Sequence, residues 1–145
     1  MELLIHVCCA DCLLKVLDSI GRYNDVPKID HMTFYFYNPN IHPRTEYLAR
    51  LKALQETVKK ITDIQYKIII PDMSPKEYFR KISLGLSFPA QNVRCPLCWE
   101  LRLRKSFEYA REHKISLVTT TLLSSKYQDE NTIIQIATNL SKEYN

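Results

Sequence analysis

The sequence predicts an α/β domain built on a Rossmann-like parallel sheet of about four strands, with helices on both faces. Short apolar runs rich in β-branched and aromatic residues alternate with longer segments of helical periodicity. Strands that alternate with helices form parallel sheets through helical crossovers. The chain has 145 residues, of which 46% are hydrophobic, so it is long enough for one core. We therefore expect a single domain over residues 1–145.

Each apolar run is bounded by polar or Pro-containing segments, which is typical of buried strands. The expected strands cover residues 3–7, 32–37, 66–70 and 117–121. The expected helices cover residues 12–23, 44–62, 75–83, 96–113 and 129–144. Pro75 and Pro96 are predicted to lie in the first turns of their helices, where the missing N–H is harmless. The second helix has one apolar face, which is predicted to contain Tyr47, Leu48, Leu51, Leu54 and Val58.

The five cysteines fall in two short segments, HVCCADC at residues 6–12 and RCPLCWELR at residues 94–102. An odd number of cysteines, without an apolar signal segment or a run of about 20 apolar residues, argues against a secreted or membrane-spanning protein. We therefore expect a cytoplasmic, reduced protein. The net charge of +4 is compatible with a nucleic-acid partner but is a weak signal. The two glycines belong to no phosphate-binding loop pattern.

Ligands of such folds bind where the loops leave the carboxyl ends of the strands. The polar and thiol side chains of this sequence gather in those loops. Cys8, Cys9 and Asp11 follow the first expected strand, and the segment NPNIHP, residues 38–43, follows the second. Residues 124–127 follow the last strand, and Arg94 to Cys98 open the helix before it. One edge of the sheet is thus the expected site.

The cysteine spacing alone leaves three kinds of site open. Cys9-x-x-Cys12 and Cys95-x-x-Cys98 have the spacing of a four-thiolate zinc site, but Cys8 and Asp11 are then left over. An iron–sulfur cluster, alone or with a second metal, uses the same thiolates. A thiol oxidoreductase is the third alternative, because a CxxC motif at a strand-to-helix junction favours a thiolate.

Several other polar residues have a structural interpretation as well as a functional one. His6 lies inside a strand and is expected in the core or behind the site rather than as a ligand. The Asn-Pro loop is either a turn or a substrate contact. The helix after Cys98 is basic and is either a solvated face or an RNA contact, aided by an exposed Tyr or Trp99. Its basic residues are Arg102, Arg104, Lys105, Arg111 and Lys114.

Four segments together closely resemble the QueH family of epoxyqueuosine reductases. They are HVCCADC, FYFYNPNIHPRTEYLARLKAL, RCPLCWELRLRKSFEYA and LVTTTLLSSKYQDENTI, in this order between about Leu3 and Ile134. The resemblance implies reduction of the epoxide of epoxyqueuosine in tRNA to give queuosine. It also implies a 4Fe-4S cluster with an adjacent mononuclear metal, expected to be iron, no cobalamin, and an external one-electron donor protein. Relatives usually continue past the last helix, so this chain is expected to be short at its C-terminus.

The resemblance also implies roles for individual residues. Cys9, Cys95 and Cys98 are expected to bind the cluster, and Cys8 and Asp11 the neighbouring metal. Many members have Pro at the position of Asp11, so either Asp11 or Cys12 supplies the extra ligand. Beside these, we hypothesise that the substrate pocket and the proton donors come from the loops, and that two arginines meet RNA. The pocket residues are Asn38, Asn40, His42 and Tyr127, the proton donors His42 or Tyr127, and the arginines Arg102 and Arg104.

Overall fold

A computed structural model describes residues 1–22, 27–72, 74–83, 91–125 and 128–145. Its strands are β1 (Glu2–His6), β2 (His31–Tyr35), β3 (Gln65–Ile69) and β4 (Leu117–Thr120). Its helices are α1 (Ala10–Arg22), α2 (Arg44–Val58), α3 (Pro75–Ser83), α4 (Gln91–Glu112) and α5 (Glu130–Tyr144), with a 3₁₀ turn η1 (Thr121–Ser124) after β4. The predicted alternation of strands and helices is confirmed.

The strands form one parallel sheet in the order β3-β2-β1-β4. His6, the last residue of β1, pairs with Tyr35 of β2 and with Thr120 of β4. The loops after these three strands therefore start level with one another. The chain runs from β1 outward to β2 and β3 and then returns to the other side of β1, which makes the β1–β4 boundary a topological switch point, the usual ligand site of such sheets.

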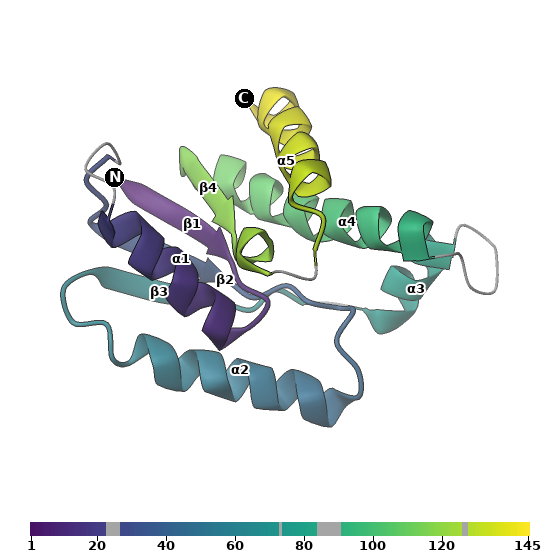
Figure 1. Cartoon of the computed structure of the whole chain (residues 1–145), viewed down its shortest axis with the longest axis horizontal. Coiled ribbons are helices and arrows are strands. Elements are labelled where there is room, and N and C mark those ends of the chain that lie inside the picture. Colours follow the sequence, from purple (N-terminus) through teal and green to yellow (C-terminus); the bar gives the residue numbers. More distant parts are fainter. Residues whose placement is uncertain (23–26, 73, 84–90, 126–127) are drawn as a thin grey trace.

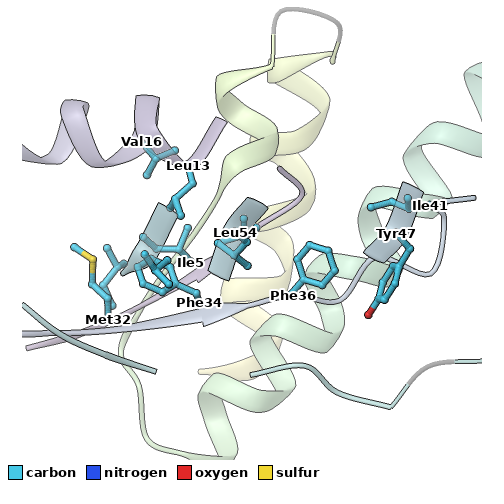
Figure 2. Close-up of a cluster of buried hydrophobic side chains, with 12 residues drawn as sticks. Ile5, Leu13, Val16, Met32, Phe34, Phe36, Ile41, Tyr47 and Leu54 are labelled. Carbon is cyan, nitrogen blue, oxygen red and sulfur yellow. The ribbon is translucent and has the colours of Figure 1, made fainter. Parts of the chain in front are cut away.

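Helices cover both faces of the sheet, as predicted (Figure 1). On one face, alternate residues of β1 and β2 pack against α1 and α2, and Figure 2 shows Phe34 of β2 and Phe36, just after this strand, beside Leu54 of α2. The opposite residues, including Leu4 and Tyr35, pack against α4. This alternation places successive strand side chains in different cores because strand side chains point to opposite faces.

The helix α5 packs against α4 and η1 rather than against the sheet itself. Trp99 and Leu103 of α4, Leu122 of η1 and Ile133 of α5 form this third apolar cluster. The helix begins where Asp129 caps it by accepting a hydrogen bond from the Thr132 amide at 3.3 Å. This third apolar cluster holds the loop after β4 against α4, the helix that also carries two of the cysteines.

Three details differ from the sequence prediction. The helix α4 begins at Gln91, so Pro96 lies inside it instead of in its first turn. Leu48 of α2 is 46% exposed, so it does not belong to the buried face made by Tyr47, Leu54 and Val58. Trp99 is 7% exposed and packs between helices, so the prediction of an exposed tryptophan for RNA stacking is wrong.

Candidate metal centre

Three thiols meet at the carboxyl end of β1. The Sγ atoms of Cys8, Cys9 and Cys12 all lie within 4.8 Å of one another. Cys8 and Cys9 occupy the β1–α1 loop, and Cys12 lies in the first turn of α1, where the Leu13 amide donates to the Cys9 carbonyl at 3.2 Å. Such a group is a ligand set for a metal that prefers thiolates.

Thr121 holds Cys8 from across the switch point. Its Oγ1 accepts a hydrogen bond from the Cys8 amide at 2.9 Å and lies 3.1 Å from Cys8 Sγ. Thr121 is fully buried at the start of η1, directly after β4. The loop after β4 therefore orients the first thiol of the loop after β1.

His6 and Thr120 form a second connection beneath the thiols. The two ring nitrogens of His6 lie 3.0 Å from Thr120 Oγ1 and 3.2 Å from the Tyr37 carbonyl oxygen. Complete burial lowers the pKa of His6 to about 3, so the ring is neutral near pH 7. This confirms the expectation that His6 lies in the core behind the site.

The pKa values of the three thiols are shifted in different directions. The hydrogen bond with Cys9, followed by burial, raises the pKa of the Cys8 thiol well above its usual range. The same hydrogen bond lowers the pKa of Cys9, and burial raises that of Cys12. Cys9 is therefore the thiol that ionises first in the metal-free protein.

Arg102 links the second cysteine segment to this edge of the sheet. The guanidinium of Arg102 donates to Asn38 Oδ1 at 2.7 Å and lies 3.9 Å from Cys98 Sγ. Asn38 in turn donates from Nδ2 to the Val7 carbonyl at 2.7 Å, next to Cys8. A chain of contacts thus runs from Cys98 on α4 to the loop that carries the three thiols.

The remaining predicted metal ligands have different positions. Cys98 is buried against Tyr78 and lies outside the group of three thiols. Asp11 is exposed in the first turn of α1 and also lies outside that group. Cys95 is part of α4, but its side chain lies outside the described residues, as does Tyr127.

The residues of the Asn-Pro loop after β2 differ in how far they are exposed to solvent. Asn38 is fully buried, and both ends of its amide have protein partners. Asn40 is half-buried, and its Oδ1 has no hydrogen-bond partner among the described residues. His42 is exposed, with its ring centroid 5.0 Å from that of Phe79. The loop therefore offers one unsatisfied acceptor and one accessible imidazole.

The two arginines predicted to meet RNA have partners within the protein. Arg102 is only 3% exposed, so it does not lie on a solvated helix face. Arg104 is about one-third exposed and pairs with Glu100 on its own helix and with Glu143 of α5. An RNA contact by Arg104 therefore requires it to exchange these carboxylates for phosphates.

The sequence reasoning missed Thr120 and Thr121 as site residues. Both are fully or nearly fully buried, and their hydroxyls bond to His6 and Cys8. The available signal was weak, because threonine is common in strands for its shape alone. Their position at the end of the last strand, beside the expected thiol loop, was the one feature that marked them.

The fold and the site define a Rossmann-like α/β domain with a thiol group at the switch point of its sheet. The family model described as "Epoxyqueuosine reductase QueH" matches residues 3–145, and the chain belongs to this family. A relative of that name from Haemophilus influenzae is 33% identical over 133 residues, covering 91% of this chain and 51% of its own length. One from Streptococcus pyogenes is 30% identical, covering 99% and 55%.

A third relative of the same name, from Dehalococcoides mccartyi, is 29% identical over 98% of this chain and 71% of its own length. The chain thus spans about half the length of the first two relatives and more of the third. Among the residues that the structure describes, no helix is both long and apolar enough to cross a membrane.

Proposed function

We propose that this chain reduces epoxyqueuosine in tRNA to queuosine. The reaction replaces the epoxide by a carbon–carbon double bond, consuming two electrons and two protons and releasing the oxygen as water. The observation that carries the proposal is the group of Cys8, Cys9 and Cys12 thiols at the switch point of a chain that belongs to this family. Reductive chemistry of this kind needs an electron-transferring group, and clustered thiolates are the ligands that such groups use.

The donor set fits an iron–sulfur cluster with a neighbouring metal. Thiolates suit both, and the Arg102 guanidinium near Cys98 suits an anionic centre. We assign Cys9, Cys95 and Cys98 to a 4Fe-4S cluster, and Cys8 with Cys12 to an adjacent metal, iron. Cys12 is favoured over Asp11 because its sulfur belongs to the thiol group and the Asp11 carboxylate does not.

When bound, these groups would relay single electrons from an external donor protein and act as a Lewis acid toward the epoxide oxygen, without cobalamin. The chain itself orients the substrate and delivers protons. Asn40 Oδ1, which has no hydrogen-bond partner among the described residues, is suited to accept a hydrogen bond from a hydroxyl or amine of the modified base. His42 is exposed and able to exchange protons with solvent, so we assign it as proton donor, with Tyr127 as the alternative.

We assign Asn38 to hold the loop that carries Asn40, since both ends of its own amide bond to protein groups. The proposed partner is tRNA carrying epoxyqueuosine, with Arg104 as the candidate phosphate contact. The proposed compartment is the cytoplasm, where reduced thiols persist.

The test is anaerobic reconstitution with iron and sulfide, followed by an assay on tRNA carrying epoxyqueuosine with a chemical one-electron reductant. Brown protein that binds iron and sulfide and converts the epoxide supports the proposal. A Cys98→Ala variant serves as control and is expected to lose the colour and the activity. Colourless protein that holds zinc and binds tRNA without turnover would identify a zinc-stabilised binding module. Redox cycling between Cys9 and Cys12 without metal would identify a thiol oxidoreductase.

A further inference from the structure

Arg102 is a buried cation that has no carboxylate partner among the residues that the structure describes. It is 3% exposed, and it takes part in none of the ion pairs formed by the described residues. Its Nε has no hydrogen-bond partner there either. Two residues further along the same helix, Arg104 has two carboxylates. Placing a charge in the interior without a counterion is costly, so a buried arginine normally has one.

Within the described part of the chain, the guanidinium of Arg102 lies beside a thiol and not beside a carboxylate. Its Nη1 lies 3.9 Å from Cys98 Sγ, one helical turn away. The hydrogen bonds from Arg102 to Asn38 and from Asn38 to the Val7 carbonyl also connect the guanidinium to the residue directly before Cys8. Thiols become anions when they bind a metal. Thiolates formed on metal binding would therefore supply a countercharge that the described residues of the metal-free protein do not.

The guanidinium is also held rigidly in this position. Nη2 donates to Asn38 Oδ1 at 2.7 Å, and Asn38 is anchored through Nδ2 to the Val7 carbonyl. Asn38 is fully buried, so the guanidinium and its anchor are shielded from solvent. A fixed charge in a low-dielectric site interacts far more strongly with a nearby group than a mobile, solvated charge does.

We propose that Arg102 is a positioning residue that supplies a fixed positive charge to the thiolate-bound centre and thereby raises its reduction potential. The inference depends on one part of the proposed function, namely that the bound centre accepts electrons. Adding an electron makes a thiolate-bound centre more negative, so a neighbouring cation stabilises the reduced form. Charge and hydrogen bonding around the ligand sulfurs are among the factors that set such potentials.

The test is a redox titration of the reconstituted protein, followed by absorption, with no substrate present. Arg102→Met removes the charge and keeps most of the volume. We expect the ratio of reduced to oxidised centre at a fixed potential to fall at least tenfold, which is about 59 mV for one electron. Arg102→Lys keeps the charge and is expected to stay within threefold of the wild type. Arg50→Met on α2 is the control and is expected to leave the ratio unchanged, because Arg50 is already paired with Glu46.

A second variant tests the charge without removing the arginine. Asn38→Asp places a carboxylate where Asn38 Oδ1 now accepts from Arg102, and it is expected to lower the reduced fraction as Arg102→Met does. A wild-type potential in either Arg102→Met or Asn38→Asp overturns the inference. An equal shift in Arg102→Met and Arg102→Lys also overturns it, since the effect would then depend on shape.

The inference and the proposed function fail in different ways. The titration reads the bound centre, so it is valid even if the epoxide is not reduced. If the wild-type protein takes up zinc and is redox-silent, the proposed function fails. The charge is then tested by chelator competition, in which Arg102→Met should weaken zinc binding at least tenfold relative to Arg50→Met. Equal zinc affinities of these two variants would overturn the inference.

Discussion

The hydroxyl of Thr121 accepts a hydrogen bond from the Cys8 amide and contacts the Cys8 sulfur, at 2.9 and 3.1 Å. These residues are 113 positions apart in the sequence, and they join the loops that follow the neighbouring strands β1 and β4. One side chain thus satisfies a backbone donor and orients a candidate ligand. The sheet topology makes this possible, because His6 and Thr120 are paired neighbours at the ends of the two strands.

Replacing Thr121 by Val is expected to destabilise the metal-free protein. Val has nearly the same shape but no hydroxyl, so the Cys8 amide loses its acceptor in a buried site. We expect the free energy of unfolding to fall by about 1–3 kcal/mol, measured by urea denaturation. Thr121→Ser retains the oxygen and is expected to lose less than Thr121→Val. If Thr121→Ser proves the more damaging change, the methyl group and not the hydroxyl stabilises this loop.

The fold was accessible from the sequence because each strand is a short, nearly continuous apolar run. Residues 3–7 and 32–37 are buried on both sides, which is the pattern that parallel sheets impose. The start of α4 was not accessible in this way. Pro96 resembles a first-turn proline, yet the helix already begins at Gln91. Leu48 was wrongly assigned to the buried face of α2, because helical periodicity identifies the apolar face of a helix but not how much of that face is buried.

The thiol group was accessible because Cys8, Cys9 and Cys12 lie within five positions of one another directly after a strand, where the loops of parallel sheets bind ligands. The role of Arg102 was not. Sequence alone does not distinguish an arginine on a solvated face from one buried beside a thiol, since neighbours on α4 such as Arg104 and Lys105 are partly exposed. Thr121 was missed because its contact with Cys8 depends on β4 lying next to β1. The order of the strands in a sheet cannot be deduced from local sequence patterns.

Changing His42 to Gln is expected to reduce epoxide turnover without loss of metal. His42 is exposed, and its ring packs against the ring of Phe79. Replacing His42 should therefore leave the fold and the thiols intact. A positioned proton donor contributes about 10²–10⁴ in rate, and we expect kcat/KM to fall within that range. His113→Gln, directly after α4, is the matched control, since His113 is also exposed and stacks on Tyr109. Equal activity of the two variants would assign the proton to another group, such as Tyr127.

Binding of tRNA is expected to depend on Arg104 through salt-sensitive contacts. Arg104→Ala should lower the slope of log affinity against log salt concentration by about 1, if the guanidinium replaces Glu100 or Glu143 by a phosphate. The control is Arg50→Ala, because Arg50 on α2 forms a similar pair with Glu46 and lies in a different helical layer. Salt slopes that are the same for both variants would show that Arg104 only joins α4 to α5.

The choice between Cys12 and Asp11 as ligand of the second metal is tested by a pair of adjacent substitutions. Cys12→Ser removes one of the three sulfurs that lie within 4.8 Å of one another, and it exchanges a soft ligand for a hydroxyl that rarely binds iron. We expect the variant to stay folded and brown, because Cys9, Cys95 and Cys98 remain. It should lose roughly one metal per chain, and with it the epoxide reduction.

Asp11→Asn is expected to retain the metal content and colour of the wild-type protein. The Asp11 carboxylate is exposed in the first turn of α1 and lies outside the thiol group, so its commonplace role is to interact with the positive end of the helix dipole. Iron and sulfide analysis of both variants, prepared side by side, provides the comparison. Loss of one metal from Asp11→Asn, with none lost from Cys12→Ser, would reverse the assignment. The carboxylate would then have to turn toward the thiols when the metal binds, a rearrangement of the first turn of α1 that Cys12 does not require.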